Sequence, residues 1–168
     1  YLKKTEIWDS HVHLFPPEIY ENWEKYAARD NWFALLTKKP ENGKGTEEAW
    51  ANAEEALDCA EKAGIYGLVM QGWYWNDEGL MTMHNDYMAD MMKRHPDRLR
   101  GFASINPKFG NKAIAEIERC AKLGFSGIGE LGPGGNGYDF NDPDFIEVLE
   151  CANALHLPVN IHCGEPVG

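Results

Sequence analysis

The sequence predicts an α/β protein built on a parallel sheet. Strand-like and helix-like segments alternate along the chain, a pattern typical of parallel strands with helices packed outside them. Continuous apolar runs such as residues 68–70 suit strands that are buried on both faces. Two architectures fit this order, a doubly wound open sheet and part of a (β/α)₈ barrel.

The positions of polar residues distinguish the two architectures. They stand where the predicted strands end, at His11, His13, Gln71, Asn106, Glu130 and His162. Active sites of (β/α)₈ barrels lie at that face of the sheet. The fingerprint of a dinucleotide-binding fold, G-x-G-x-x-G, does not follow the first predicted strand. We therefore expect a (β/α)₈ barrel.

The elements follow from the spacing of apolar residues. Apolar, β-branched segments predict strands over residues 5–14, 65–73, 99–106, 125–131 and 157–163. Helical spacing predicts helices near residues 18–29, 47–63, 80–94, 111–123 and 143–155. We expect the strands to be parallel and to lie in sequential order, as neighbouring strands of a barrel do.

Capping residues mark the ends of several helices. Thr46 is a good N-cap for the second helix, which Gly64 ends. Asp142 caps the last helix, with Pro143 in its first position. Residues 38–45 are expected to form a loop, and the glycine-rich residues 132–137 a flexible active-site loop, with a phosphate cradle as the alternative.

Composition excludes some classes of function. The 168 residues suit one domain, and the net charge of −11 argues against a sequence-independent nucleic-acid binder. We expect no membrane span and no signal peptide. The spacing of the four cysteines indicates neither a C-x-x-C pair nor a secreted disulfide framework, so we expect reduced thiols in the cytoplasm. The expected partner is a small-molecule substrate, and assembly into a homo-oligomer is a further possibility that the sequence does not decide.

The pattern His11-Val12-His13 is the strongest functional signal. Residues i and i+2 of a strand face the same way, so both imidazoles can converge on one metal ion. His162 ends another predicted strand and supplies a third imidazole. Zinc is the first expectation from imidazole ligands, while manganese and iron also fit. The alternative is two unrelated histidines in a loop.

Three further residues are candidates for contact with a substrate. Trp73 and Trp75 follow the second strand on the expected active face, where aromatic side chains suit a pocket wall. Asn106 ends the third strand on the same face. Core packing is the alternative for the aromatic residues.

Four motifs in this order resemble the amidohydrolase superfamily, and within it amidohydrolase family 2. They are DSHVH at residues 9–13, HPDR leading into GFASINP at residues 95–107, GFSGIGEL at residues 124–131, and LPVNIH at residues 157–162. The resemblance implies a (β/α)₈ barrel that binds one or two divalent metals. It implies metal ligation by His11, His13 and His162. Glu130 matches a place where a carboxylate or modified lysine bridges two metals in some members, with a supporting or substrate contact as the alternative.

The resemblance also implies that part of the barrel lies outside this sequence. The family's usual general base is an aspartate at the end of strand eight, whereas this sequence ends at Gly168, just after the fifth strand. A barrel usually needs about 250 residues. We therefore expect residues 1–168 to be a single, partial barrel domain of about five β/α units, with the general base in the absent part.

Three functions are carried forward. The first is a metal-dependent hydrolase that attacks a C–N or C–O bond through a metal-activated water, with His162 and Glu130 as its catalytic residues. The alternative is a metal-dependent decarboxylase or hydratase of the same family, which is a lyase. The third is a barrel relic that binds a ligand without turnover.

Overall fold

The structure is a computed structural model that describes residues 6–37 and 50–163. Its centre is a parallel five-stranded sheet with the order β1-β2-β3-β4-β5. The strands are β1 (Trp8–Val12), β2 (Gly67–Gln71), β3 (Leu99–Ala103), β4 (Gly127–Leu131) and β5 (Val159–Ile161). This confirms the prediction of parallel strands in sequential order. A doubly wound sheet, in which the order reverses about the first strand, is excluded.

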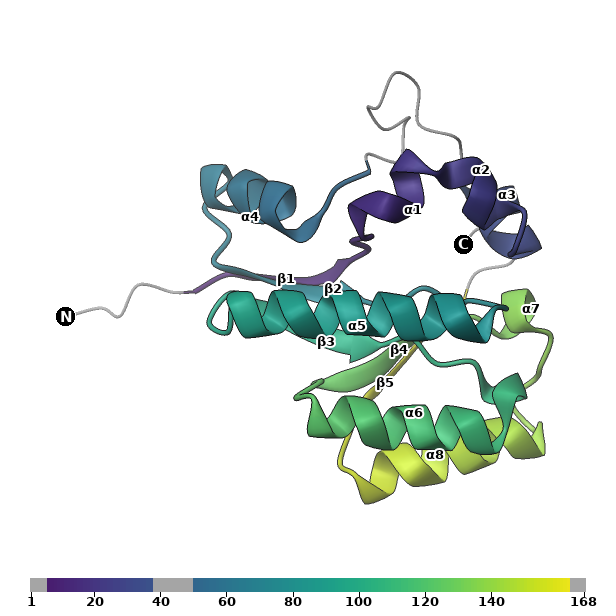
Figure 1. Ribbon diagram of the computed structural model, residues 1–168. Helices are drawn as coiled ribbons and strands as arrows, with labels where there is room; N and C mark the ends of the chain where they lie inside the picture. The colour runs from purple at the N-terminus through teal and green to yellow at the C-terminus, as the bar shows by residue number, and fades with distance from the viewer. Residues whose placement is uncertain (1–5, 38–49, 164–168) are drawn as a thin grey trace.

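Helices surround the sheet and extend beyond one of its ends. They are α1 (Pro17–Glu21), α2 (Trp23–Ala27), α3 (Asn31–Leu36), α4 (Ala53–Lys62), α5 (Glu78–Arg94), η1 (Pro107–Phe109), α6 (Asn111–Lys122), α7 (Pro133–Asn136) and α8 (Pro143–Ala154). In Figure 1, α5, α6 and α8 run along the sheet, whereas α1–α3 and α7 lie toward the end at which the strands terminate. In the described ranges, no helix combines the length and apolar character needed to cross a membrane.

The first predicted helix, residues 18–29, is divided in the structure. The backbone leaves helical geometry at Asn22, which has φ −120° and ψ 39°. The Asn22 side chain donates to the carbonyl oxygen of Glu18 at 3.0 Å, and such local side-chain bonds compete with the helical hydrogen bonds of the main chain. Helix α3 then adds a turn that the sequence pattern did not predict.

The next helix begins later than predicted. Asn52 caps α4, and its side chain accepts from the Glu55 backbone while the Glu55 side chain accepts from the Asn52 backbone. This reciprocal capping box satisfies two N–H groups that a helix start leaves unpaired. The predicted cap Thr46 and the predicted loop at residues 38–45 lie outside the described residues.

Residues 132–137 do not form the flexible loop that the sequence analysis expected. Four of them form α7, which begins at Pro133 and ends where Gly137 takes the left-handed conformation with φ 69°. Proline presets the helical φ at the first position, and glycine accepts the left-handed one without strain. The Asn136 side chain fastens this turn to the Tyr74 carbonyl oxygen at 3.0 Å.

The described residues form two apolar cores. The larger core fills the space between the sheet and the helices that cover it, with Met70, Met88 and Ile117 fully buried. The second core is an aromatic cluster, defined here as Phe15, Tyr26, Phe33, Trp73, Tyr74 and Trp75. It joins α1–α3 to the segment that follows β2, so that the helices beyond the strand ends are anchored to the sheet.

A buried polar network connects α5, α6 and the end of β3. The amide nitrogen of Asn85 donates to the Ser104 carbonyl oxygen at 2.9 Å and to Glu116 Oε1 at 2.7 Å, while its oxygen accepts from the Ser104 backbone at 2.8 Å. Asn85 has 0% and Glu116 7% relative exposure. Arg119 donates two hydrogen bonds to the same carboxylate. Buried polar groups are tolerated because each one has a partner.

We predict that Asn85→Ala lowers the free energy of unfolding by about 3 kcal/mol, because it leaves the Ser104 peptide groups and part of the Glu116 carboxylate buried without partners. Urea unfolding followed by circular dichroism measures the change. Asn153→Ala on the exposed face of α8 is the matched control and is expected to change stability by less than about 0.5 kcal/mol. Equal losses in both variants would contradict the role of the network.

Candidate metal centre

His11 and His13 come together at the end of the first strand. The register between β1 and β2 shifts between Asp9 and Val12, so an extra residue of β1 is accommodated there. Such bulges re-aim the side chains beside them. His11 Nε2 and His13 Nε2 lie 3.2 Å apart, which is the convergence that the spacing predicted.

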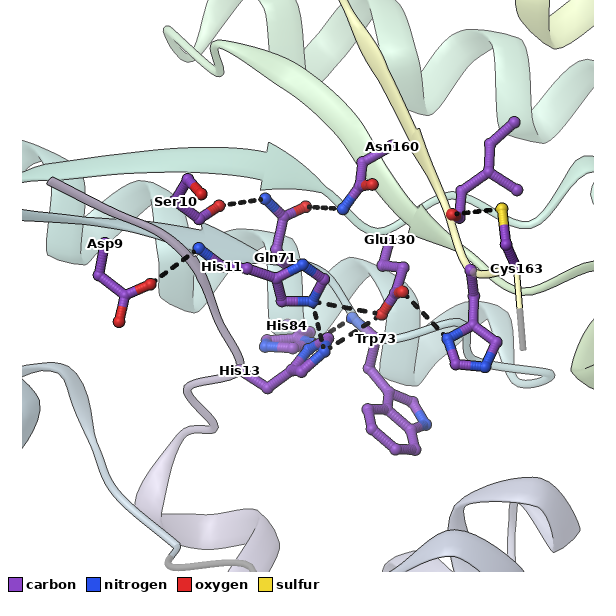
Figure 2. Close-up of polar contacts among 12 residues, drawn as sticks. Asp9, Ser10, His11, His13, Gln71, Trp73, His84, Glu130, Asn160 and Cys163 are labelled. Atoms are coloured by element: carbon purple, nitrogen blue, oxygen red, sulfur yellow. Dashed lines mark hydrogen bonds and ion pairs between the residues drawn. The ribbon is translucent and has the colours of Figure 1, made fainter. Parts of the chain in front are cut away.

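Glu130 meets both imidazoles from β4. Its Oε2 lies 3.2 Å from His13 Nε2 and 3.5 Å from His11 Nε2. The Glu130 side chain retains only 10% exposure, whereas His11 retains 43%. In Figure 2 the three side chains point toward a common position.

His162 lies on the opposite side of the Glu130 carboxylate. Its Nδ1 is 3.0 Å from Glu130 Oε1, while its Nε2 is buried without a hydrogen-bond partner in the described part of the chain. An ionised carboxylate only accepts hydrogen bonds, so Nδ1 carries a proton in this contact, and in the neutral ring Nε2 then presents a lone pair. The structure thus brings His11, His13 and Glu130 to one point. His162, which was also predicted as a metal ligand, is not part of this group and lies next to it through its contact with Glu130.

The electrostatics keep Glu130 ionised. Burial raises the pKa of its carboxyl, but hydrogen bonds from His13 and His162 and the charges of His13 and His11 outweigh that effect. The net result is a pKa below the ordinary value for glutamate. At neutral pH Glu130 is therefore a carboxylate that can pair with a cation.

An aromatic wall runs from His13 to His162. The Trp73 ring contacts the His13 ring edge-on at 5.6 Å and stacks on Tyr74 with centroids 4.8 Å apart. The Tyr74 ring lies 5.8 Å from the His162 ring. Trp73, predicted as a substrate residue, is therefore next to the histidines, and Tyr74 joins it there.

The other two predicted substrate residues are buried and bonded to residues outside the group of His11, His13 and Glu130. Trp75 has 0% relative exposure in the aromatic cluster, and its indole N–H donates to His84. Asn106 has 1% relative exposure and bonds to the Trp75 carbonyl oxygen and the Lys108 backbone. Trp75 therefore has a buried partner on α5, and Asn106 bonds to the backbone of the connections that follow β2 and β3.

Hydrogen bonds of Gln71 and Asp9 support the backbone around the cluster of His11, His13 and Glu130. The Gln71 amide nitrogen donates to the Ser10 carbonyl oxygen at 3.1 Å, and its oxygen accepts from the Asn160 side chain at 3.1 Å. This chain of bonds crosses from β1 through β2 to β5 (Figure 2). Its signal in the sequence is a polar side chain at the end of an apolar strand. Asp9 accepts from the His11 backbone at 3.1 Å and so restrains the main chain there.

Gly129 allows β4 and β5 to approach each other beside Glu130. Its φ of +133° is a conformation that residues with a side chain rarely adopt, and a Cβ there would lie 2.5 Å from the Asn160 carbonyl oxygen. The register between β4 and β5 also shifts between Ile128 and Leu131. The backbone at residue 129 therefore sets the direction in which Glu130 points.

The donor set fits a divalent cation. Two imidazole nitrogens and one carboxylate oxygen lie within 4.8 Å of one another. Nitrogen and oxygen donors of this kind hold zinc, manganese or iron. His11, His13 and Glu130 are thus the residues that could bind a metal, with His162 Nε2 as a further lone pair nearby.

Comparison with known proteins shows the family to which the chain is related. A sequence profile of the family described as Amidohydrolase matches residues 8–168. A 2-amino-3-carboxymuconate-6-semialdehyde decarboxylase from Dictyostelium discoideum is 28% identical over 120 residues, which cover 71% of this chain and 27% of that protein. A gamma-resorcylate decarboxylase from a Polaromonas species is 30% identical over 94 residues, which cover 49% of this chain and 27% of that protein.

Solved structures share the fold. A 5-carboxyvanillate decarboxylase from Novosphingobium aromaticivorans, in complex with manganese and 4-hydroxy-3-methoxy-5-nitrobenzoic acid, has a TM-score of 0.73 at 20% identity. The match covers 94% of this chain and 50% of that one. The chain thus corresponds to a sector of a (β/α)₈ barrel and spans about half the length of this structure.

We predict that Gly129→Ala destabilises the fold by more than about 2 kcal/mol, because strain at positive φ adds to the clash with Asn160. Gly64→Ala is the matched control, since Gly64 also has a positive φ, +73°, but no atom lies within 4 Å of its would-be Cβ. It is expected to show the strain alone, about 1 kcal/mol. Thermal unfolding of both variants checks this, and equal destabilisation would show that the close approach of β4 and β5 is unimportant.

Proposed function

We propose that this chain, which belongs to the amidohydrolase family, forms the first five strands of the barrel of a divalent-metal-dependent decarboxylase. The proposed substrate is a small aromatic or unsaturated carboxylic acid. The observation that carries the proposal is the convergence of His11 Nε2, His13 Nε2 and Glu130 Oε2 beside an aromatic wall. The names of the two curated relatives favour the lyase over the hydrolase that the sequence analysis put first.

The proposed metal ligands are His11, His13 and Glu130. When bound, a divalent metal withdraws electron density from substrate oxygen atoms and offsets negative charge. Manganese is the first ion to test, since a similar structure was solved with manganese, whereas the imidazole ligands alone favoured zinc. The low pKa of Glu130 supports a role as an anionic ligand rather than as a proton donor.

His162 is the proposed proton carrier. Its Nδ1–H is held by Glu130, so the lone pair on Nε2 is free to take up a proton. In a decarboxylation the carbon–carbon bond breaks, carbon dioxide leaves, and the electron pair stays on carbon. A proton delivered from His162 Nε2 to that carbon would complete the reaction. The Trp73–Tyr74 wall suits a planar ring lying between His13 and His162.

Two other functions would give different results in the experiments described below. A hydrolase would cleave an ester, lactone or amide with the same residues. A barrel relic would bind metal without turnover. The cytoplasm stays the proposed location, supported by four free cysteines, and a small molecule stays the proposed partner.

We predict that the whole chain binds one Mn²⁺ ion through these side chains. Electron paramagnetic resonance of free Mn²⁺ measures the dissociation constant. His13→Ala and Glu130→Gln are each expected to weaken binding by about 100-fold or more, because the first removes a ligand and the second removes the negative charge of one. His156→Asn is the matched control, because His156 is exposed and has a positive φ of 57°, a conformation that asparagine accepts. Unchanged affinity in His13→Ala would refute the proposed ligands.

We predict that the protein in its full natural length releases carbon dioxide from hydroxybenzoic or unsaturated carboxylic acids when loaded with Mn²⁺. His162→Asn is expected to reduce the rate by about 10²–10⁴-fold, the usual contribution of a positioned acid or base. His156→Asn is expected to react at the wild-type rate. Turnover of esters or lactones without carbon dioxide release would favour the hydrolase, and binding of metal without any turnover would favour the relic.

A further inference from the structure

His84 is a buried histidine that the proposed reaction does not use. It lies on α5 with 0% relative exposure, and its ring stacks on Phe15 at 5.2 Å with an interplanar angle of 16°. Its Nε2 is 2.9 Å from the Leu14 carbonyl oxygen. Its Nδ1 accepts from the Trp75 indole N–H at 3.2 Å and faces the Trp73 backbone N–H at 3.5 Å.

These partners determine where the proton of His84 lies. An indole N–H can only donate, so Nδ1 must accept, and a carbonyl oxygen can only accept, so Nε2 must donate. The neutral ring with its proton on Nε2 is the one form that satisfies both sides. Burial lowers the pKa of His84 to about 4, so the ring is neutral at physiological pH. The residue therefore acts as a fixed crosslink between two backbone segments.

The two segments that His84 joins are the ones that flank His13. Leu14 follows His13 directly, and the Trp73 ring contacts the His13 ring at 5.6 Å. Strand β1 ends at Val12, so His13 lies beyond the last residue of the strand. The Nδ1 of His13 has no hydrogen-bond partner in the described residues that would orient its ring. Its Nε2 faces His11 Nε2 and Glu130 Oε2, each at 3.2 Å. Beyond these contacts within the site, the direction of the His13 imidazole depends on the backbone after it and on the Trp73 ring beside it.

We propose that His84 is a positioning residue that holds the His13 imidazole toward Glu130. It does so by fastening the Leu14 carbonyl group to the segment that carries Trp73. The consequence for metal binding rests on the proposed function, in which His13 is a metal ligand. The expected effect on the orientation of the His13 ring does not depend on the proposed function.

Three variants separate positioning from general packing. His84→Phe keeps a ring but removes both hydrogen bonds. His84→Gln keeps one amide N–H and one oxygen for the same two partners. Met81→Ala, one turn earlier on α5 and 1% exposed in the same core, removes packing without touching Leu14.

Two measurements on the whole chain test the proposal. Nitrogen-15 nuclear magnetic resonance of histidine-labelled protein without metal reports the tautomer and environment of each ring. Binding of Mn²⁺ is measured by electron paramagnetic resonance. His84→Phe is expected to shift or broaden the His13 ring signals and to weaken Mn²⁺ binding about 10–100-fold, the usual effect of losing a residue that orients a ligand. His84→Gln is expected to fall between this variant and the wild type, and Met81→Ala to retain wild-type signals and affinity despite lower stability.

Several results would overturn the proposal. Unchanged His13 signals in His84→Phe would show that His84 does not orient that ring. Equal loss of Mn²⁺ affinity in Met81→Ala would show that packing alone is responsible. If wild type and His13→Ala bind Mn²⁺ equally well, the proposed function fails, while the resonance measurement still decides whether His84 orients His13.

Discussion

The curvature of the sheet is the constraint on which the candidate site depends. β1 and β4 are three positions apart in the sheet order, which in a flat sheet would separate their backbones by about 14 Å. Yet the side chains of His13, just after β1, and Glu130, on β4, meet with Nε2 and Oε2 only 3.2 Å apart. The contact requires the sheet to curl so that side chains at its strand ends point toward a common axis, as in a barrel. The same curvature allows Gln71 to bridge Ser10 and Asn160 from opposite edges.

Burial and charge at Glu130 depend on each other. A carboxylate with 10% exposure is costly unless charged or hydrogen-bonding groups face it, and His11, His13 and His162 supply those groups. Within the described residues, hydrogen bonds from these histidines satisfy the Glu130 carboxylate, whereas His13 Nδ1 and His162 Nε2 stay without a partner. The contacts that hold the ends of β1, β4 and β5 near one another are therefore made by the same side chains that form the candidate metal site.

The segments beyond the strand ends give the site its surroundings. The aromatic cluster joins α1–α3 to the residues after β2, and it places Trp73 and Tyr74 beside the histidines. The Asn85 network fastens the end of β3 to α5 and α6. Ser104 also donates to the Trp73 carbonyl oxygen, which links that network to the aromatic wall. These buried contacts outside the sheet thus support the polar residues of the candidate site.

From the sequence, the alternation of strands and helices and the polar residues at the strand ends predicted the barrel and the sequential strand order, and the structure has that order. The pairing of His11 with His13 was predicted because side chains at i and i+2 of a strand face the same way. The sequence also singled out Glu130 and His162 by their places at strand ends, although their roles stay predictions. The partners of His84, the positions of Trp75 and Asn106, the break at Asn22 and the helix at residues 133–136 were decided only by the tertiary structure. The contacts of His84, Trp75 and Asn106 depend on which residues, distant in the chain, satisfy each buried polar group, and local spacing carries no information about such partners.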